Sequence, residues 1–194
     1  MTAARPALRR DLRARRRALP AAQRIAAADA LAAHLLQSSL LPATGYVAGY
    51  WAMDGEIGLH AFQLRLPPAL VYCLPILDDE RCLRFAPWRP GDALVTNRYG
   101  IPEPHVSPQS ALTAADMAMV VLPLVGFDAR GNRLGMGGGW YDRTLAFRTA
   151  GTPPVLVGAA FAMQQLEALD AASWDVRLDA VCTEAGILTN RECG

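Results

Sequence analysis

A glycine-rich stretch directly after an apolar run constrains this chain more than any other feature. The apolar run is Met119–Val125, and five glycines follow between Gly131 and Gly139. Residues 140–147 then continue with the pattern of a helix. Glycine adopts positive φ angles without steric cost and lets a ligand approach the backbone closely. The pattern therefore predicts a buried strand that leads through a glycine loop into a helix.

The composition of this loop favours phosphate binding. Its free N–H groups would lie at the N-terminus of the helix, where the helix dipole attracts an anion. Arg133 and Arg143 bracket the loop, and Asp142 follows it where a carboxylate can hold a metal ion carried by a phosphate. The stretch matches neither a P-loop nor a dinucleotide fingerprint. The glycines alone also fit a flexible hairpin or lid, but the flanking Arg, Tyr and Asp residues favour phosphate.

The stretch Asn132–Asp142 resembles the signature of the 5-formyltetrahydrofolate cyclo-ligase family, and the resemblance extends from Arg5 to Glu184. It implies conversion of 5-formyltetrahydrofolate to 5,10-methenyltetrahydrofolate with hydrolysis of ATP to ADP and phosphate. It also implies ATP as co-substrate and Mg²⁺ as cofactor, with Arg133 and Asp142 in catalytic roles. The implied ATP-binding residues are Arg5, Arg9, Arg133, Leu134, Gly135, Met136, Gly137, Gly138, Gly139, Trp140 and Tyr141.

Residues 3–18 predict an amphipathic helix with arginines along one side. Arg5, Arg9 and Arg13 recur four residues apart, beside a row of leucines. On its own this stripe fits a solvated arginine face. Members of the family begin with a basic residue and then Leu-Arg, whose side chains reach the ATP phosphates. The resemblance therefore places Arg5 and Arg9 at the nucleotide, with Arg5 where the family usually has lysine.

The resemblance places the folate-binding residues after a predicted strand, residues 44–51. Trp51 ends that strand, and Glu56 follows the next turn and begins a predicted helix that extends to Leu66. Tyr141 from the signature is assigned to the substrate as well. An aromatic wall and a carboxylate suit a pterin, which offers a flat face and ring N–H donors. A glutamate at this point could also merely complement the helix dipole.

Near the C-terminus the resemblance makes Asp175 a second magnesium contact beside Asp142. The family commonly has His-Asp there, whereas this chain has Trp174-Asp175, so the carboxylate is retained and the histidine is replaced. Residues 99–104, Tyr-Gly-Ile-Pro-Glu-Pro, match a family hexapeptide that we interpret as mainly architectural, with a role in the pocket as the alternative.

Strands that alternate with helices predict one α/β domain over residues 1–194, with a mixed, largely parallel sheet covered by helices on both faces. The sites would lie along one sheet edge, where loops after several strands converge. The other predicted elements are a helix over 21–38 that buries Ile25, Leu31, Leu35 and Leu36, a strand over 69–74 closed by Pro75, strands over 82–86 and 155–160, and a helix over 161–169.

Composition narrows the cellular setting. Nineteen basic residues, all arginine, nearly balance 18 acidic ones, so net charge creates no general attraction to nucleic acid or an anionic membrane. The four cysteines contain no C-x-x-C pair, which favours a reducing compartment. No apolar stretch approaches the roughly 20 residues of a membrane span. We therefore expect a cytoplasmic protein. Its expected partners are the small molecules that the resemblance implies, ATP and 5-formyltetrahydrofolate, and we expect a monomer, although the sequence itself does not determine the oligomeric state. The cysteines are Cys73, Cys82, Cys182 and Cys193.

Two other function classes stay open. A different ATP- or nucleotide-dependent enzyme could use the same glycine loop with another acceptor, although Trp51, Glu56 and the Pro-Glu-Pro segment argue against it. A nucleic-acid-binding protein could use the basic helix as an electrostatic footprint. Its weakness is that the other arginines are scattered and offset by acids. The arginines in question are Arg13, Arg15, Arg16 and Arg17.

Overall fold

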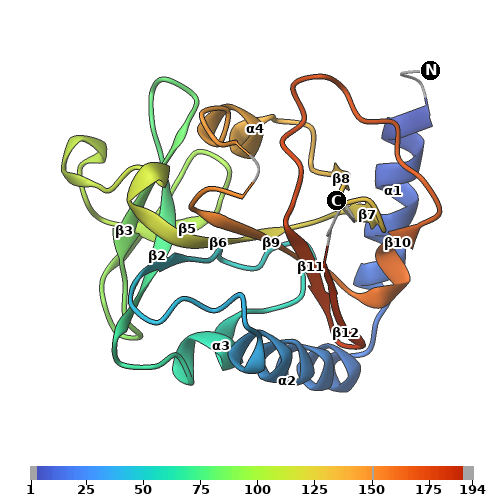
Figure 1. The fold of residues 1–194 in the computed structure, drawn as a ribbon, viewed down its shortest axis with the longest axis horizontal. Helices are drawn as coiled ribbons and strands as arrows, with labels where there is room; N and C mark the ends of the chain where they lie inside the picture. The colour runs from blue at the N-terminus through green and yellow to red at the C-terminus, as the bar shows by residue number, and fades with distance from the viewer. Residues whose placement is uncertain (1–3, 150, 190–194) are drawn as a thin grey trace.

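Five parallel strands form the centre of the main sheet, and one antiparallel strand lies at each edge (Figure 1). The computed structural model describes residues 4–149 and 151–189; Cys193 lies outside them. The strand order is β12-β11-β9-β6-β1-β2-β3. This confirms the predicted mixed, largely parallel sheet. The strands are β1 Gly45–Ala48, β2 Leu70–Leu77, β3 Leu83–Pro87, β6 Met117–Pro123, β9 Val155–Ala159, β11 Ala180–Thr183 and β12 Gly186–Thr189.

The strand order creates a crevice at the carboxyl ends of β1 and β6. After β1 the chain adds β2 on one side, whereas β6, β9 and β11 add successively on the other side. In open α/β sheets, ligands bind outside the carboxyl ends of the strands at the point where this order reverses. Trp51 follows β1, and the glycine loop follows β6, so both predicted halves of the site start from this crevice.

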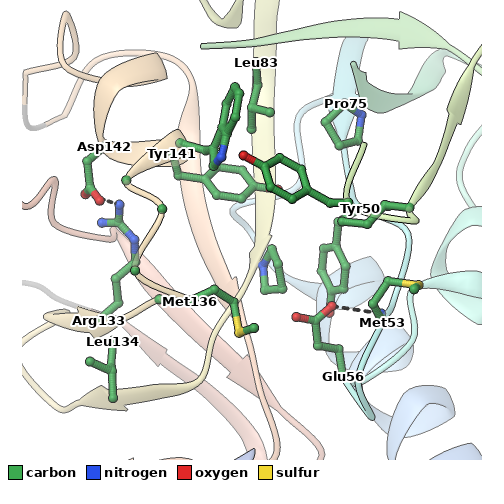
Figure 2. A pocket seen from close by; sticks show the side chains of 18 of the residues that line it. Tyr50, Met53, Glu56, Pro75, Leu83, Arg133, Leu134, Met136, Tyr141 and Asp142 are labelled. Carbon is green, nitrogen blue, oxygen red and sulfur yellow. Dashed lines mark hydrogen bonds and ion pairs between the residues drawn. The ribbon is translucent and has the colours of Figure 1, made fainter. Parts of the chain in front are cut away.

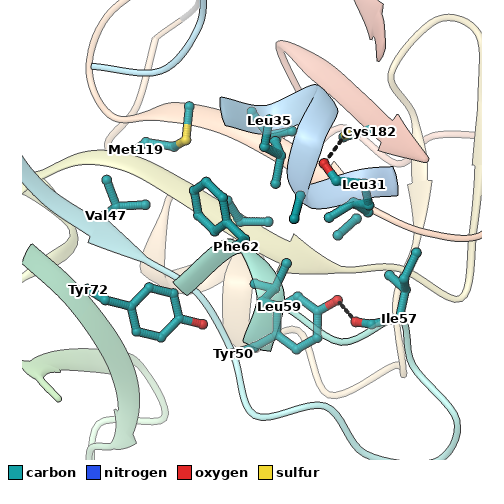
Figure 3. Packing of buried hydrophobic residues seen from close by; sticks show 14 of the residues in the cluster. Leu31, Leu35, Val47, Tyr50, Ile57, Leu59, Phe62, Tyr72, Met119 and Cys182 are labelled. Atoms are coloured by element: carbon teal, nitrogen blue, oxygen red, sulfur yellow. Dashed lines mark hydrogen bonds between the residues drawn. The ribbon is translucent and has the colours of Figure 1, made fainter. Parts of the chain in front are cut away.

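Helices α2 (Ala21–Gln37) and α3 (His60–Leu64) cover one face of the sheet (Figure 3). There Leu31 and Phe62 pack with Val47 and Met119. Full burial of a side chain of this size stabilises the fold by about 1.5–3 kcal/mol. On the opposite face, Leu145 after the short helix α4 (Trp140–Thr144) packs with residues of the central strands.

No described helix is both long enough and apolar enough to cross a membrane.

Helix α1 (Ala4–Arg17) packs against a small second sheet. Its Leu12 is fully buried with Val125 and Leu134. This sheet has the order β10-β7-β8, from β7 (Gly126–Asp128), β8 (Arg133–Leu134) and β10 (Gln165–Leu166). The remaining elements are the hairpin β4 (Leu94–Thr96) and β5 (Pro102–Pro104) and the 3-10 turns η1 (Pro108–Ser110), η2 (Ala114–Asp116) and η3 (Ala162–Gln164).

The β7–β8 hairpin separates β6 from the glycine loop, which the sequence did not predict. Its turn is held by Asp128, which accepts hydrogen bonds from Arg130 N, Asn132 N and Asn132 Nδ2 at 2.9–3.0 Å and from Leu169 N at 2.9 Å. Burial opposes ionisation of this carboxylate, but the bonds from Asn132 and the three backbone N–H groups prevail and lower its pKa. The glycine loop itself is therefore only residues 135–139.

Three boundary predictions near the site were wrong. The helix expected from Glu56 begins at His60, and Glu56 belongs instead to the turn after β1, in which its N–H donates to Met53 O. Strand β2 continues through Pro75 to Leu77. Its pairing with β1 ends at Cys73, so the missing N–H of Pro75 removes no ladder bond there. Helix α4 ends at Thr144 instead of residue 147.

Two further predictions also fail. The helix expected over 161–169 is replaced by η3 and β10. The buried Gln164 side chain donates to Leu124 O and Val125 O at 2.8 Å each, which holds this segment across the end of β6. Ile25 is 66% exposed, because burial in α2 begins only at Ala27.

Candidate active site

A cavity of about 740 Å³ opens at the carboxyl ends of β1 and β6. It brings together every residue that the sequence analysis placed in a site, from the N-terminal helix, the β1–α3 connection, the glycine loop and the segment before β11. These residues are Arg5, Arg9, Trp51, Glu56, Arg133, Leu134, Gly135, Met136, Gly137, Gly138, Gly139, Trp140, Tyr141, Asp142 and Asp175.

The N-terminal arginines of helix α1, Arg5 and Arg9, line the same cavity as the glycine loop. Arg9 Nε donates to Gly135 O at 2.8 Å. At Gly137, whose φ is +97°, an added Cβ would lie 3.5 Å from Arg9 Cζ. Partial burial and the nearby Arg5 charge lower the pKa of Arg9, while Asp175 opposes that shift. The basic stripe is therefore more than a solvated face, because part of it lines the cavity.

Short helix α4 changes the expected basis of phosphate binding. It contains five residues, so it carries little of the macrodipole that a long helix would have. Attraction of an anion would therefore depend on the backbone N–H groups of residues 135–139 and on the arginines around them, and less on the dipole of α4.

Two arginine–carboxylate pairs line the loop side of the cavity. Arg133 donates to Asp142 Oδ1 and to Val176 O, and Val176 N donates to Asp142 Oδ1 at 3.2 Å. Arg5 pairs with Asp175 Oδ2 at 3.2 Å, and Ala172 N donates to that oxygen at 2.9 Å. Each carboxylate thus uses one oxygen in these contacts.

The carboxylates of the cavity fit a magnesium ion that is coordinated mainly by the phosphates of a bound substrate. Within residues 4–149 and 151–189, no three His, Cys, Asp or Glu side chains are grouped to hold a metal ion. Asp142 and Asp175 nevertheless both line the cavity. Magnesium is commonly bound through one or two carboxylates together with substrate phosphates. Two carboxylates beside a phosphate-type loop match that pattern.

Glu56 and aromatic rings form the other side of the cavity. Figure 2 shows Tyr50, Met53 and Glu56 opposite Arg133 and Asp142. Glu56 Oε2 accepts a hydrogen bond from Met53 N at 3.0 Å, and the carboxylate side chain is only 10% exposed. Burial raises the pKa of Glu56, whereas the Met53 N–H and Arg16 oppose the rise. The carboxylate is therefore held in a turn, and not at a helix N-terminus.

Two tryptophan contacts shape the cavity walls. Trp51 packs edge-to-face on Trp88 with 5.7 Å between ring centroids. Trp140 packs edge-to-face with Tyr99 at 6.0 Å and has Arg143 over its ring at 5.5 Å. The contact of Trp140 with Tyr99 joins the hairpin β4–β5 to the start of α4.

Sequence reasoning missed several cavity residues. Tyr50 lies beside Trp51, and its hydroxyl donates to Ile57 O at 2.5 Å. Asn97 and Tyr99 enter from the β4–β5 hairpin, where Glu103 accepts bonds from Asn97 Nδ2 and Leu77 N. Trp174 is 74% exposed at the rim. The hexapeptide match, for which a pocket role was left open, was the signal for Tyr99. The replacement of the family histidine was the signal for Trp174, and Tyr50 had no signal beyond its neighbour Trp51.

Comparison with known proteins shows which family this chain resembles along its length. A profile of the 5-formyltetrahydrofolate cyclo-ligase family matches residues 1–184. The chain belongs to this family. Its site thus shows how a cyclo-ligase family member without lysine arranges arginines around the glycine loop.

Named family members align along nearly the whole chain. The 5-formyltetrahydrofolate cyclo-ligase of Haemophilus influenzae is 35% identical over 181 residues, covering 91% of this chain and 96% of that protein. The one from Escherichia coli K12 is 35% identical over 181 residues, covering 91% and 98%. The NMR structure of Aquifex aeolicus 5,10-methenyltetrahydrofolate synthetase superposes with a TM-score of 0.82 at 24% identity, covering 98% of this chain and 94% of that one. The last comparison supports the fold.

Proposed function

We propose that this chain catalyses the ATP-dependent cyclisation of 5-formyltetrahydrofolate to 5,10-methenyltetrahydrofolate, releasing ADP and phosphate. The observation that carries the proposal is one cavity with two chemically different sides. The glycine loop with Arg9 and Arg133 suits phosphates, and Glu56 with Trp51 suits a pterin. The relatives that share the family are named for this reaction.

The chemistry requires activation of a poor leaving group. Transfer of the γ-phosphoryl group of ATP to the formyl oxygen makes that oxygen part of a phosphate leaving group. N10 of the folate then attacks the formyl carbon, loses its proton and closes the five-membered ring as phosphate departs. The protein has to align the formyl oxygen with the γ-phosphate and neutralise the charge in transfer.

The cavity residues suit these tasks. Arg5, Arg9 and Arg133 with the N–H groups of residues 135–139 would stabilise the transferring phosphoryl group. Magnesium, when bound, would neutralise phosphate charge, and Asp142 and Asp175 would hold it together with phosphate oxygens. Glu56 would accept pterin N–H donors, and Trp51 and Tyr141 would contact the ring.

The nucleic-acid alternative loses its main support. Arg13, Arg16 and Arg17 all form ion pairs with Asp54, so three arginines of the proposed footprint are engaged within the fold. The other alternative, a different ATP-dependent enzyme, keeps the loop but needs another acceptor on the Glu56 side.

One assay separates these functions. We expect ATP hydrolysis that requires 5-formyltetrahydrofolate and magnesium, with a matching rise in methenyl-folate absorbance. Hydrolysis without a folate requirement would favour a different ATP-dependent enzyme. Salt-sensitive DNA binding without turnover would favour the nucleic-acid function.

We further propose that residues 1–194 act as one domain and as a monomer in the cytoplasm. The proposal is supported by the presence of both predicted halves of the site in one chain. A sedimentation experiment on active enzyme should give the mass of a single chain, 20.9 kDa.

A further inference from the structure

Arg16 is fully buried near the end of α1. It lies behind the cavity wall, where it contacts Asp54 and Glu56, two residues that line the cavity. Its Nε donates to Asp54 O at 2.9 Å, its Nη2 to Asp54 Oδ2 at 2.9 Å, and its Nη1 to Leu124 O at 3.2 Å. Nη2 also lies 3.5 Å from Glu56 Oε1. Arg16 thereby connects the turn after β1 with the segment after β6.

The neighbouring arginines do not duplicate this arrangement. Arg13 Nε bonds to Asp54 Oδ2 at 2.6 Å, and Arg17 Nη1 lies 3.3 Å from Asp54 Oδ1. Asp54 would therefore keep two cationic partners without Arg16. Glu56 differs, because Arg16 is the one cation within 4.0 Å of its carboxylate in the described part of the chain.

We infer that Arg16 is a positioning residue for the substrate: it fixes the direction of the Glu56 carboxylate at the cavity wall. The inference rests on the proposed function, in which Glu56 accepts pterin N–H groups. Arg16 reaches Oε1 and the Met53 N–H reaches Oε2. A carboxylate has about four acceptor positions, so lone pairs on both oxygens remain for the pterin.

Arg16 also favours the ionised form of Glu56. Burial raises the pKa of this carboxyl and the Asp54 charge adds to the rise, whereas the Met53 N–H, Arg16 and, more weakly, Arg13 lower it. Tyr50 and Tyr141 lie near it as well: burial raises the pKa of both phenols, and the Glu56 charge adds to the rise. Loss of Arg16 would let the pKa of Glu56 rise further. If folate binding needs ionised Glu56, then binding would be lost at a higher pH than in wild type as the pH is lowered, because Glu56 would be protonated earlier.

The first test compares Arg16→Met with Arg17→Met, a matched control that loses an Asp54 ion pair without touching Glu56. For Arg16→Met we expect the KM for 5-formyltetrahydrofolate to rise about tenfold with the KM for ATP within about twofold. The acid limb of kcat/KM for folate should move upward by about half a pH unit or more. Arg17→Met should leave both quantities near wild type. An Arg16→Met variant with an unmoved acid limb, or with equal rises in both KM values, overturns the inference.

The second test is a double-mutant cycle on folate binding, measured by calorimetry. If Arg16 acts through Glu56, Arg16→Met should weaken binding much less in a Glu56→Gln background than in wild type. Additive effects would mean that Arg16 is only a structural residue, and would overturn the inference. Arg16→Lys serves if Arg16→Met does not fold: the ammonium lacks the planar fork, so the folate KM should rise while the acid limb stays near wild type. In that variant, a wild-type folate KM overturns the inference. Wild-type protein that binds no 5-formyltetrahydrofolate would overturn the proposed function itself.

Discussion

Asp142 illustrates how one side chain can join two parts of the cavity wall. Its Oδ1 accepts from Arg133 and from the Val176 N–H, so it links the hairpin strand β8 to the segment before β11. The Arg133 side chain is only 6% exposed, and Asp142 is its carboxylate partner. The same carboxylate faces the cavity where a phosphate-bound magnesium ion would lie in the proposed function.

Asp142→Asn should therefore lower turnover more than stability. The amide keeps an oxygen for the Val176 N–H, but it loses the charge that suits both Arg133 and magnesium. We expect kcat to fall by about 10- to 100-fold, with a smaller effect on the thermal midpoint, which should drop because Arg133 loses its charged partner. Turnover at saturating magnesium is the measurement. Near wild-type turnover under that condition would remove Asp142 from the metal site.

At the scale of the element, the glycines of the glycine loop differ in their backbone conformations. Gly137 and Gly139 have φ angles of +97° and +66°, whereas Gly135 has no positive φ, and a Cβ added there would meet no atom within 4 Å. A positive φ is strained for most residues other than glycine, alanine included. The loop therefore contains both required and replaceable glycines.

Gly137→Ala should destabilise the fold more than Gly135→Ala does. The alanine at position 137 has to adopt a strained backbone and would contact Arg9, with an expected cost of about 1–2 kcal/mol in the free energy of unfolding. Urea unfolding of both variants measures the difference. Equal stabilities would show that the loop relaxes to a conformation in which residue 137 has a negative φ.

The complete fold places two chemically different sides of one cavity opposite each other. The cavity lies where the strand order reverses between β1 and β6. Arg5 and Arg9 of α1 line one side of it, and Glu56 from the turn after β1 lines the other. ATP and folate would thus meet across the cavity while contacting mostly different residues. Substitutions on the two sides should consequently have separable effects on the two substrates.

Glu56→Gln and Arg9→Ala test this separation as a reciprocal pair. Glu56→Gln keeps the shape but loses charge, and charge-assisted hydrogen bonds contribute about 1.5–3 kcal/mol each. It should weaken folate binding by about 10- to 100-fold and leave ATP affinity unchanged. Arg9→Ala should raise the KM for ATP and leave the KM for folate near wild type. Titration of each ligand alone into each variant is the measurement; weakened ATP binding in Glu56→Gln would place Glu56 on the nucleotide side.

Much of the cavity lining was predictable because its chemistry is local in the sequence. Residues 132–142 form one continuous stretch in which glycine, arginine and aspartate already indicate phosphate, and the parallel sheet follows from alternating strands and helices. The sequence also predicted where β6, β9 and α2 lie, since each has a clear apolar pattern. These features depend on neighbours within a few residues, which is the information that periodicity and motifs contain.

Only the tertiary structure decided how the remaining residues act. Arg15, Arg16 and Arg17 are equivalent by composition, yet Arg16 alone of the three is fully buried, because its place on α1 faces Asp54 and Leu124. Gln164 likewise replaces an expected helix with a short strand by bonding to backbone about 40 residues away. Short-range pattern determined elements such as β6, β9 and α2 and indicated phosphate at the glycine loop, whereas the family resemblance supplied the residues for the pterin. Burial and long-range hydrogen bonds, which depend on the packed fold, decided which charges are held inside it and which face the cavity.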